Sequence, residues 1–340
     1  MSFLEEIGEF GLIEKFKNWF IPQSSRVVLG IEDDCAVVEG NCDRWYLLTC
    51  DSQVEDIHFV KKMIPPHLLG RRVLAVNLSD IAAMGGDPLW ALLSLVLNPS
   101  LGEEWLNRFF QGVREEAKEF GLDIIGGNLA RSFGPLVFDL TLIGEMDRGA
   151  PLLLRRNAQP GELIGVTGTL GDSAAGLKIV SSGKSKDMEI YSFLCNRYFC
   201  PTPRVKVGKA IRRLDLRGAL IDISDGFIQD LGHILEESKV GATIEADRLP
   251  LSSDLKKWCF EKKCDPWNLA LAGGEDFELI FTFPREREEE IKTYIWQVAG
   301  VEVTVVGEIT SEKKLTIFQE GKEIKPSLRG WNHFRKEKER

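Results

Sequence analysis

Residues 71–95, RRVLAVNLSDIAAMGGDPLWALLSL, decide the fold, because they join a helical pattern to a strand pattern. The apolar spacing predicts a helix over 65–84, and ALLSLVL at 91–97 predicts a strand. WYLLTC at 45–50 predicts another strand ahead of the helix. Strands and helices that alternate in this way indicate an α/β domain.

The same pattern extends over both halves of the chain. A helix over about 102–120, a short strand at 122–126 and a strand at 136–146 complete a first half with four strands. Residues 9–20 predict an amphipathic helix whose aromatic stripe packs on a core. Glycines and prolines in RGAPLLLRRNAQPGE at 148–162 break regular structure, and alternation resumes after them. We therefore expect two α/β domains, 1–148 and 149–340.

Composition is that of a globular protein and limits its partners. With 340 residues, 44% hydrophobic and 28% charged, the chain is long enough for two domains. A formal net charge of −9 argues against nucleic acid and anionic membranes, whose phosphates it would repel. Apolar runs too short for a bilayer and an acidic N-terminus predict a cytoplasmic protein. Seven cysteines without a C-x-x-C pair predict neither a disulfide framework nor a zinc site.

Aspartates in short, turn-like segments are the first functional signal. Each alone is explained by turn or helix-cap chemistry, because Asp side chains accept hydrogen bonds from nearby backbone N–H groups. Three of the segments, however, follow the apolar runs VVLGI, WYLLTC and GALIDI, so their carboxylates could gather at strand ends. Carboxylates together with phosphate oxygens are preferred ligands of Mg²⁺, which predicts a magnesium-dependent enzyme that uses a nucleotide. The six positions are Asp33, Asp34, Asp51, Asp80, Asp222 and Asp225.

The common phosphate-binding loops are absent from the sequence. SGKS at 182–185 ends like a Walker A loop, but Lys178 stands where its first glycine should be. A Rossmann G-x-G-x-x-G is also missing, and GTLGDSAAG at 168–176 fits a helix start with Asp172 as its N-cap. A nucleotide must then be held through metal ions and separate anion contacts.

Ten motifs, in order and spacing, resemble the bacterial thiamine-monophosphate kinases over nearly the whole chain. They are GIEDDCAVV, TCDSQVEDIHF, RRVLAVNLSDIAAMGGDPLWALLSL, IIGGNLARS, LLRRNAQPGE, VTGTLGDSAAGL, PTPRV, DISDGFIQDLGHI, AGGEDFELIFT and RGWNHF. Within the superfamily that includes aminoimidazole ribonucleotide synthetase, selenophosphate synthetase and a hydrogenase-maturation protein, V-E-x-x-H-F and W-N-H-F are similar to the kinase branch.

The resemblance implies a fold and a reaction. It implies a two-domain, aminoimidazole ribonucleotide synthetase-like α/β fold, in which the N-terminal domain binds ATP and Mg²⁺ and its sheet pairs across a homodimer. The C-terminal domain is expected to close the active site. The implied reaction is the Mg²⁺-dependent transfer of a phosphoryl group from ATP to thiamine monophosphate. Because the acceptor phosphate is already ionised, positioning and charge neutralisation carry such a reaction and no strong general base is needed.

The resemblance also implies roles for individual residues. The implied magnesium-site residues are Asp34, Thr49, Cys50, Asp51, Asp80, Asn128, Asp222 and Asp225. The implied nucleotide contacts are Phe110, Gly127, Asn128, Arg155 and Ser224, with Arg155 also adding positive charge for catalysis. His58, Glu275 and Trp331 are implied on the thiamine-phosphate side. Structural readings stay open: Trp331 could pack the C-terminus, His58 and Phe110 could belong to the core, and Glu275 could be an acid at a helix N-terminus.

Three departures from the commoner family pattern bear on the metal site. Glu32 replaces a glycine, Cys50 a hydroxyl residue, and Asn128 an aspartate. A thiol is a poor magnesium ligand and an amide carries no charge, so at least one metal site is expected to be weaker or to use a backbone carbonyl. Two alternatives follow: a non-catalytic nucleotide-binding regulator, or another ATP-dependent enzyme of the superfamily. Selenophosphate synthetase is disfavoured because MSFLEEIGEFGLIEKF lacks a reactive cysteine.

Overall fold

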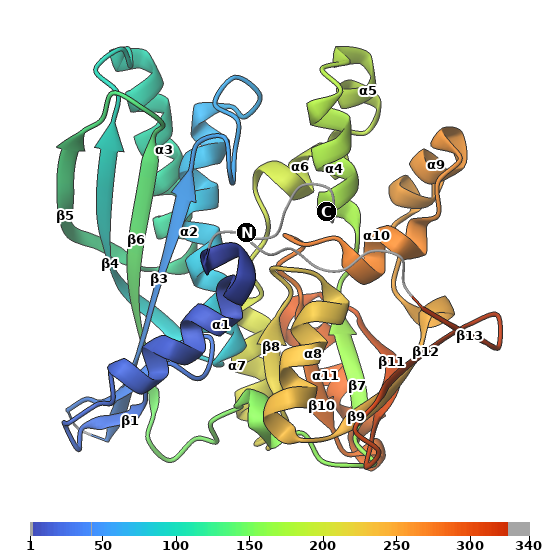
Figure 1. Ribbon diagram of the computed structural model, residues 1–340. Helices are drawn as coiled ribbons and strands as arrows, with labels where there is room; N and C mark the ends of the chain where they lie inside the picture. The colour runs from blue at the N-terminus through green and yellow to red at the C-terminus, as the bar shows by residue number, and fades with distance from the viewer. Residues whose placement is uncertain (1–2, 42, 326–340) are drawn as a thin grey trace.

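The computed structural model describes residues 3–41 and 43–325 and builds them around two sheets (Figure 1). The first has the strand order β1-β2-β3-β6-β4-β5, in which only β4 and β5 run parallel. Its strands are β1 (Val27–Leu29), β2 (Ala36–Glu39), β3 (Arg44–Val54), β4 (Asp87–Leu97), β5 (Asp123–Arg131) and β6 (Val137–Asp147). The sequence predicted four of these six. The run VVLGI, taken as the strand ahead of Asp33 and Asp34, contains β1, whereas β2 is too short to show a periodicity.

Two helices, α2 (Pro66–Ala83) and α3 (Glu103–Phe120), pack together and cover one face of this sheet (Figure 1). Both were predicted within two residues of these bounds. They approach closely because glycines lie at the crossing: a Cβ on Gly70 would stand 2.1 Å from the Phe109 carbonyl oxygen, and one on Gly112 would stand 1.9 Å from that of His67. The opposite, open face of the sheet carries exposed side chains such as those of Trp90 and Leu92 on β4.

The second sheet has the order β13-β12-β9-β11-β7-β10-β8. Its strands are β7 (Leu163–Thr167), β8 (Leu220–Asp222), β9 (Gly241–Glu245), β10 (Leu279–Phe283), β11 (Val303–Thr310), β12 (Leu315–Gln319) and β13 (Lys322–Ile324). Helices around it are α4 (Asp172–Ser181), α5 (Ser185–Ile190), α6 (Ser192–Phe199), α7 (Val205–Arg213), α8 (Phe227–Ser238), α9 (Ser253–Lys262), α10 (Pro266–Ala272) and α11 (Glu288–Ala299). Short 3-10 turns are η1 (Arg155–Asn157), η2 (Ala246–Arg248) and η3 (Arg285–Arg287). The predicted domain boundary at 148/149 lies between β6 and β7 and stays a prediction.

Helix α2 lies at the junction between the two halves. A Cβ on Gly208 of α7 would stand 2.0 Å from the Ala82 carbonyl oxygen, so the small residues at the end of α2 accommodate α7. Asp87, just beyond, pairs with Arg212 at 2.8 Å and with Lys209. Buried apolar side chains from both halves form one continuous cluster. The small-residue end of α2 therefore serves to join the two domains.

The prediction for the N-terminal helix was partly wrong. Helix α1 (Phe3–Trp19) exists, and Phe10 lies against His233 of α8 with ring centroids 4.5 Å apart. Phe16, Trp19 and Phe20, however, are exposed instead of packed on a core. Lys17, in the last turn of α1, pairs with Glu237 of α8 at 3.6 Å, so α8 contacts this turn while its aromatic side chains stay in solvent. Among the described residues, no helix has the length and apolarity needed to cross a membrane.

Candidate active site

Three aspartates from distant parts of the chain meet at the junction of the domains. One carboxylate oxygen each from Asp34, Asp80 and Asp222 lies within 4.8 Å of the other two. Asp34 lies in the loop between β1 and β2, Asp80 in the last turn of α2, and Asp222 at the end of β8. Asp34 and Asp222, whose segments follow apolar runs, thus meet as the strand-end pattern predicted, and Asp80 joins them from a helix. The cluster draws on both domains.

Each carboxylate of this acidic cluster has a polar neighbour that orients it. The Thr49 hydroxyl donates to Asp80 Oδ2, and the Ser79 hydroxyl donates to Asp222 Oδ2 at 2.6 Å. Arg155 of η1 pairs with Asp34, and its backbone N–H donates to Asp33 Oδ2 at 3.0 Å. Arg155 thus brings one positive charge to a site that holds several carboxylates.

Burial and mutual repulsion raise the pKa values of the acids in this cluster. Burial and the neighbouring Asp34 charge raise the pKa of Asp222 to about 8. Burial raises the pKa of Asp80 well above its usual range, and the charges of Asp51 and Asp222 add to the effect. The pKa of Asp33 rises to about 7 for the same two kinds of reason. A cation placed among these groups would favour their ionised forms, and so would oppose both the effect of burial and the repulsion between the carboxylates.

The donor set fits a hard divalent cation. All three acids of the cluster offer oxygen ligands, which Mg²⁺ prefers to nitrogen or sulfur. Within the described part of the chain, Asp34 Oδ2 is a buried oxygen without a hydrogen-bond partner. A buried, unpaired carboxylate oxygen is costly, and a metal ion would satisfy it.

The loop after β8 and the loop before β10 meet beside the acidic cluster. Ser224 and Asp225 lie in the first, and the Glu275 N–H donates to the Ser224 carbonyl oxygen at 2.7 Å. The Gln229 amide donates to Asp225 Oδ2 at 2.9 Å. Burial, together with the Glu9 charge on α1, raises the pKa of Asp225 to about 7. The structure thus brings the predicted residues Ser224, Asp225 and Glu275 together.

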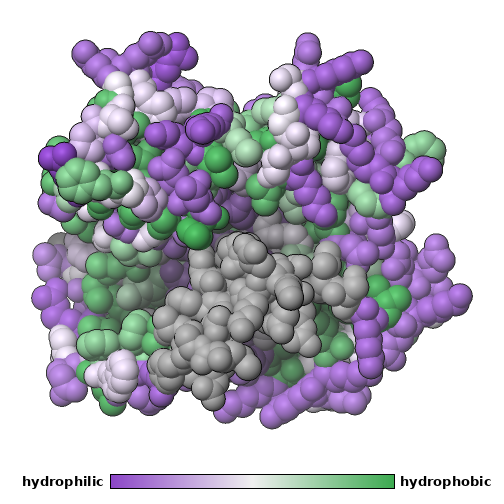
Figure 2. All heavy atoms as spheres, turned by 45° about the horizontal axis from the view of Figure 1, so that its top comes forward, coloured by the Kyte–Doolittle hydropathy of each residue, from purple (hydrophilic) through white to green (hydrophobic). Residues whose placement is uncertain are grey.

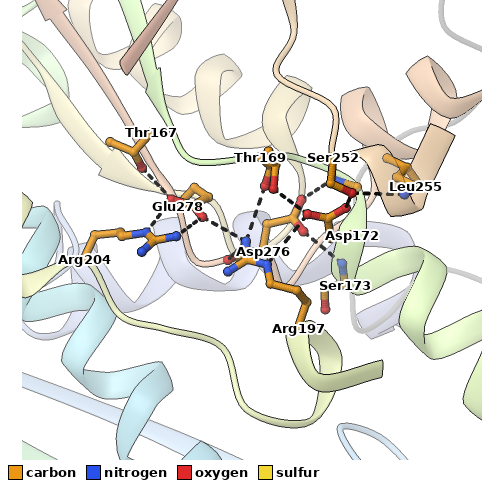
Figure 3. Close-up of polar contacts among 11 residues, drawn as sticks. Thr167, Thr169, Asp172, Ser173, Arg197, Arg204, Ser252, Leu255, Asp276 and Glu278 are labelled. Carbon is orange, nitrogen blue, oxygen red and sulfur yellow. Dashed lines mark hydrogen bonds and ion pairs between the residues drawn. The ribbon is translucent and has the colours of Figure 1, made fainter. Parts of the chain in front are cut away.

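A buried ionic network holds the far side of the Glu275 loop (Figure 3). Asp276 accepts hydrogen bonds from the Gly171 and Ser173 N–H groups at the start of α4, at 2.6 and 3.0 Å. Glu278 pairs with Arg197 at 2.9 Å and also with Arg204. Every oxygen of these two acids has a donor, so the network has a structural role. It fixes the loop on which Glu275 stands.

Other predicted residues lie on the opposite face of the first sheet. Side chains alternate along β3, so Thr49 and Asp51 face α2 whereas Cys50 points away from it. The Thr141 hydroxyl lies 3.5 Å from Cys50 Sγ on that open face. Asn128 of β5 shares the open face, because its register partner Ser94 aligns with Asp139, whose side chain accepts from Ser52. Within one chain, Cys50 and Asn128 do not join the acidic cluster.

Phe110 and Gly127 are also remote from the acidic cluster. β6 and β4 separate β5 from β3, and strands lie about 4.8 Å apart, so β5 is about 14 Å from β3. Phe110 is 43% exposed on α3 and lines a cavity of about 640 Å³ between α3 and β5. Arg114, Lys118 and Asp123 line the same cavity, so two basic groups and one acid border an otherwise apolar recess. A nucleotide contact here would need a second chain to reach the cluster.

Two more predicted residues have separate outcomes. His58 lies in the turn after β3, where its Nδ1 accepts from the Val54 N–H at 3.1 Å, so the turn fixes its ring. Trp331 lies outside the described residues.

Sequence reasoning also missed Arg72, which is fully buried on α2. Its signal was a charged residue within the otherwise apolar helical stripe of RRVLAVNL.

Comparisons with known families cover most of the chain. The family described as AIR synthase related protein, N-terminal domain, matches residues 32–146. Its C-terminal counterpart matches residues 159–320. These two matches agree with the predicted two-domain fold.

Curated relatives and solved structures agree along the full length. A thiamine-monophosphate kinase of Haemophilus influenzae is 36% identical over 336 residues, which cover 98% of this chain and 99% of that protein. A thiamine-monophosphate kinase of Aquifex aeolicus is 37% identical over 333 residues, covering 97% and 99%. The structure of AaThiL complexed with AMPPCP and TMP matches with a TM-score of 0.85 and 34% identity, covering 98% of this chain and 99% of that one.

Proposed function

The chain belongs to the thiamine-monophosphate kinases of the AIR synthase related family, and we propose that it transfers the γ-phosphoryl group of ATP to thiamine monophosphate. The products are thiamine diphosphate and ADP. The single observation that carries the proposal is the acidic cluster of Asp34, Asp80 and Asp222 at the domain junction, in a chain that matches these kinases over its whole length.

Asp34, Asp80 and Asp222 are the residues that would hold Mg²⁺, with Asp51 and Asp225 close by. Bound there, the ion would neutralise charge on the phosphate groups of the two substrates, which otherwise repel each other. The hydroxyls of Thr49 and Ser79 orient the carboxylates, as their hydrogen bonds to Asp80 and Asp222 indicate. Because Asp34 and Asp80 come from the first domain and Asp222 from the second, the site can form only when the two domains are in contact.

Arg155 supplies the fixed positive charge. It is held between Asp33 and Asp34, so its guanidinium lies beside the carboxylates instead of in solvent. The neighbouring acids raise the pKa of Arg155 further, which keeps it protonated throughout the working range. A permanently charged planar group suits a phosphate oxygen, and it would stabilise the charge of the transferred group.

A second copy of the chain is proposed to cover the open face of the first sheet. All nine residues of β5 are exposed and β5 is an edge strand, an arrangement that invites pairing with another chain. Trp90, Leu92 and Ile125 add exposed apolar side chains. Figure 2 shows such side chains gathered on the left half of the molecule, over this domain.

Dimerisation would also explain why some of the predicted nucleotide contacts lie far from the acidic cluster of their own chain. Phe110, Gly127 and Asn128 lie on α3 and β5, too far across the sheet to reach the acidic cluster of their own chain. We propose that they contact the nucleotide bound at the partner's cluster. The cytoplasmic location expected from the sequence stays a prediction.

Purified protein with ATP, Mg²⁺ and thiamine monophosphate is expected to form thiamine diphosphate and ADP in equal amounts, measured by chromatography of both products. Withholding thiamine monophosphate is the control, and it should suppress ADP formation. A folded protein that binds ATP but forms no thiamine diphosphate would favour the alternative of a non-catalytic nucleotide-binding regulator. Phosphorylation of a different acceptor would favour another enzyme of the superfamily.

The dimer is expected to fail when Leu92 is replaced by Glu, because a charge would then stand in the middle of the covered face. Light scattering should give twice 38.2 kDa for the parent and 38.2 kDa for Leu92→Glu, with turnover lost as well. Leu177→Glu is the matched control, since both leucines are 41% exposed and Leu177 lies on α4 in the other domain. A parent mass of one chain at micromolar concentration would contradict the proposal.

A further inference from the structure

Arg72 is a buried arginine that joins three separate segments. Its side chain is fully buried, and Nε donates to Gln53 Oε1 of β3 at 2.9 Å. One terminal nitrogen donates to the backbone carbonyl of Tyr198 on α6, and the other pairs with Glu275. The guanidinium also lies 5.3 Å from the centre of the Tyr198 ring. Two of these three partners belong to the other half of the chain.

The Glu275 segment has a backbone conformation that needs support. Glu275 has a φ of 66° and Phe277 a φ of 49°, and neither is a glycine. Such left-handed residues are unfavourable, and they persist only where their surroundings hold them. Two backbone hydrogen bonds do so, from Glu275 to Ser224 at 2.7 Å and from Phe277 to Ile223 at 2.9 Å.

The loop is therefore held from both domains. On its far side, Asp276 and Glu278 are fixed within the C-terminal domain by the network of Figure 3. On its near side, the Glu275 side chain pairs with Arg72 of α2, the helix that also carries Asp80. One rigid helix thus contributes an acid to the cluster and positions the loop next to it.

We propose that Arg72 is a positioning residue for the thiamine-monophosphate side of the active site. It holds the Glu275 carboxylate beside Ser224 and Asp225, and it does so only when the two domains are in contact. The Glu275 side chain keeps 28% exposure, so a substrate can still reach it. This role rests on the proposed function and on the thiamine-phosphate role that the family resemblance implies for Glu275, whose carboxylate suits the cationic thiazolium ring of the substrate.

The geometry requires an arginine at this position. Three N–H groups of one planar guanidinium point to Gln53, Tyr198 and Glu275, and the same plane lies near an aromatic ring. A lysine keeps the charge but cannot reach three acceptors in a fixed fork. Arg72→Lys should therefore preserve part of the effect, whereas Arg72→Met should remove it.

The test compares Arg72→Met and Arg72→Lys with Arg71→Met as the matched control. Arg71 is the neighbouring arginine, and its partners Glu116 and Glu119 both lie on α3 of the same domain. In Arg72→Met, KM for thiamine monophosphate should rise about tenfold or more, because a hydrogen bond to a charged group is lost. KM for ATP should stay within about twofold in the same variant, since its contacts are elsewhere. Arg71→Met should change neither constant.

Hydrogen exchange provides a readout that does not depend on turnover. The Glu275 and Phe277 amides should exchange faster in Arg72→Met than in the parent or in Arg71→Met. If Arg72→Met does not fold, Arg72→Lys and Gln53→Met carry the test, with smaller changes in the same direction. Unchanged exchange at both amides, or an unchanged KM for thiamine monophosphate, would overturn the proposal. A parent that forms no thiamine diphosphate would refute the function instead, and the exchange comparison would still decide the role of Arg72.

Discussion

Asp80→Asn is expected to abolish turnover while leaving the protein folded. Asp80 lies within 4.8 Å of Asp34 and Asp222, so the change removes a charged oxygen ligand from the acidic cluster. Stabilisation by a metal ion is worth several kcal/mol, which corresponds to a loss of about 10³-fold in kcat. Asparagine has nearly the same shape and keeps an acceptor for the Thr49 hydroxyl. High Mg²⁺ should restore part of the activity.

The same variant should be more stable than the parent in the absence of metal. The pKa of Asp80 is raised by burial and by the charges of Asp51 and Asp222, so its ionised form opposes folding near neutral pH. A neutral amide removes the buried charge and its repulsion with Asp51 and Asp222. The unfolding temperature in chelator should therefore be higher for Asp80→Asn than for the parent. Asp215→Asn is the control: Asp215 is exposed, and asparagine tolerates its φ of 51°. Near-normal turnover of a folded Asp80→Asn protein would exclude Asp80 from the site.

Metal-free protein should lose stability as the pH rises from about 4 to about 8. Asp222 has a usual pKa of 3.8 that is raised to about 8 in the folded chain, and that of Asp33 is raised to about 7. Between these limits the folded state binds more protons than the unfolded state, so the free energy of unfolding falls with pH. A tenfold difference in proton affinity between the two states corresponds to about 1.4 kcal/mol, and the stabilisation is fully present only below the unfolded pKa.

Magnesium should reverse this trend. It binds the ionised carboxylates of the folded chain, and binding at one hundred times Kd stabilises by about 2.7 kcal/mol. The temperature of thermal unfolding, measured from pH 5 to pH 8, should therefore fall with pH in chelator and stay nearly constant in Mg²⁺. In Asp222→Asn, the unfolding temperature measured in chelator should change less between pH 5 and pH 8 than it does in the parent. An equal gain from Mg²⁺ at pH 5 and pH 8 would show that the ion binds elsewhere.

Long regular elements could be predicted from the sequence because their side chains repeat. The helix at 65–84 and the strand at 91–97 correspond to α2 and β4, and the helix at 102–120 corresponds to α3. Short elements such as β1 and α5 contain too few residues for a period to show. The aromatic stripe of α1 looked like a core face, but in the last turn Lys17 contacts α8 whereas Trp19 is exposed.

Local motifs identified the acids of the site and suggested that some of them meet, but they did not show which ones. Asp34, Asp80 and Asp222 were singled out in turn-like segments, and the structure places them together. The family resemblance also implied Asn128 as a magnesium-site residue, and it lies across the sheet from them. Arg72 was missed, because its role arises from partners 126 and 203 residues away along the chain.

The two α/β halves, the chemistry of the ligands and the family could be predicted from residue type and local spacing. The face that each residue occupies, and the distant segments that meet, became known only from the folded structure. Adjacent residues on β3 show the reason: Asp51 turns towards α2 and the cluster, whereas Cys50 turns to the open face. That choice follows from the pairing of β3 with its neighbours and from the burial of one face against α2, neither of which is local in the sequence.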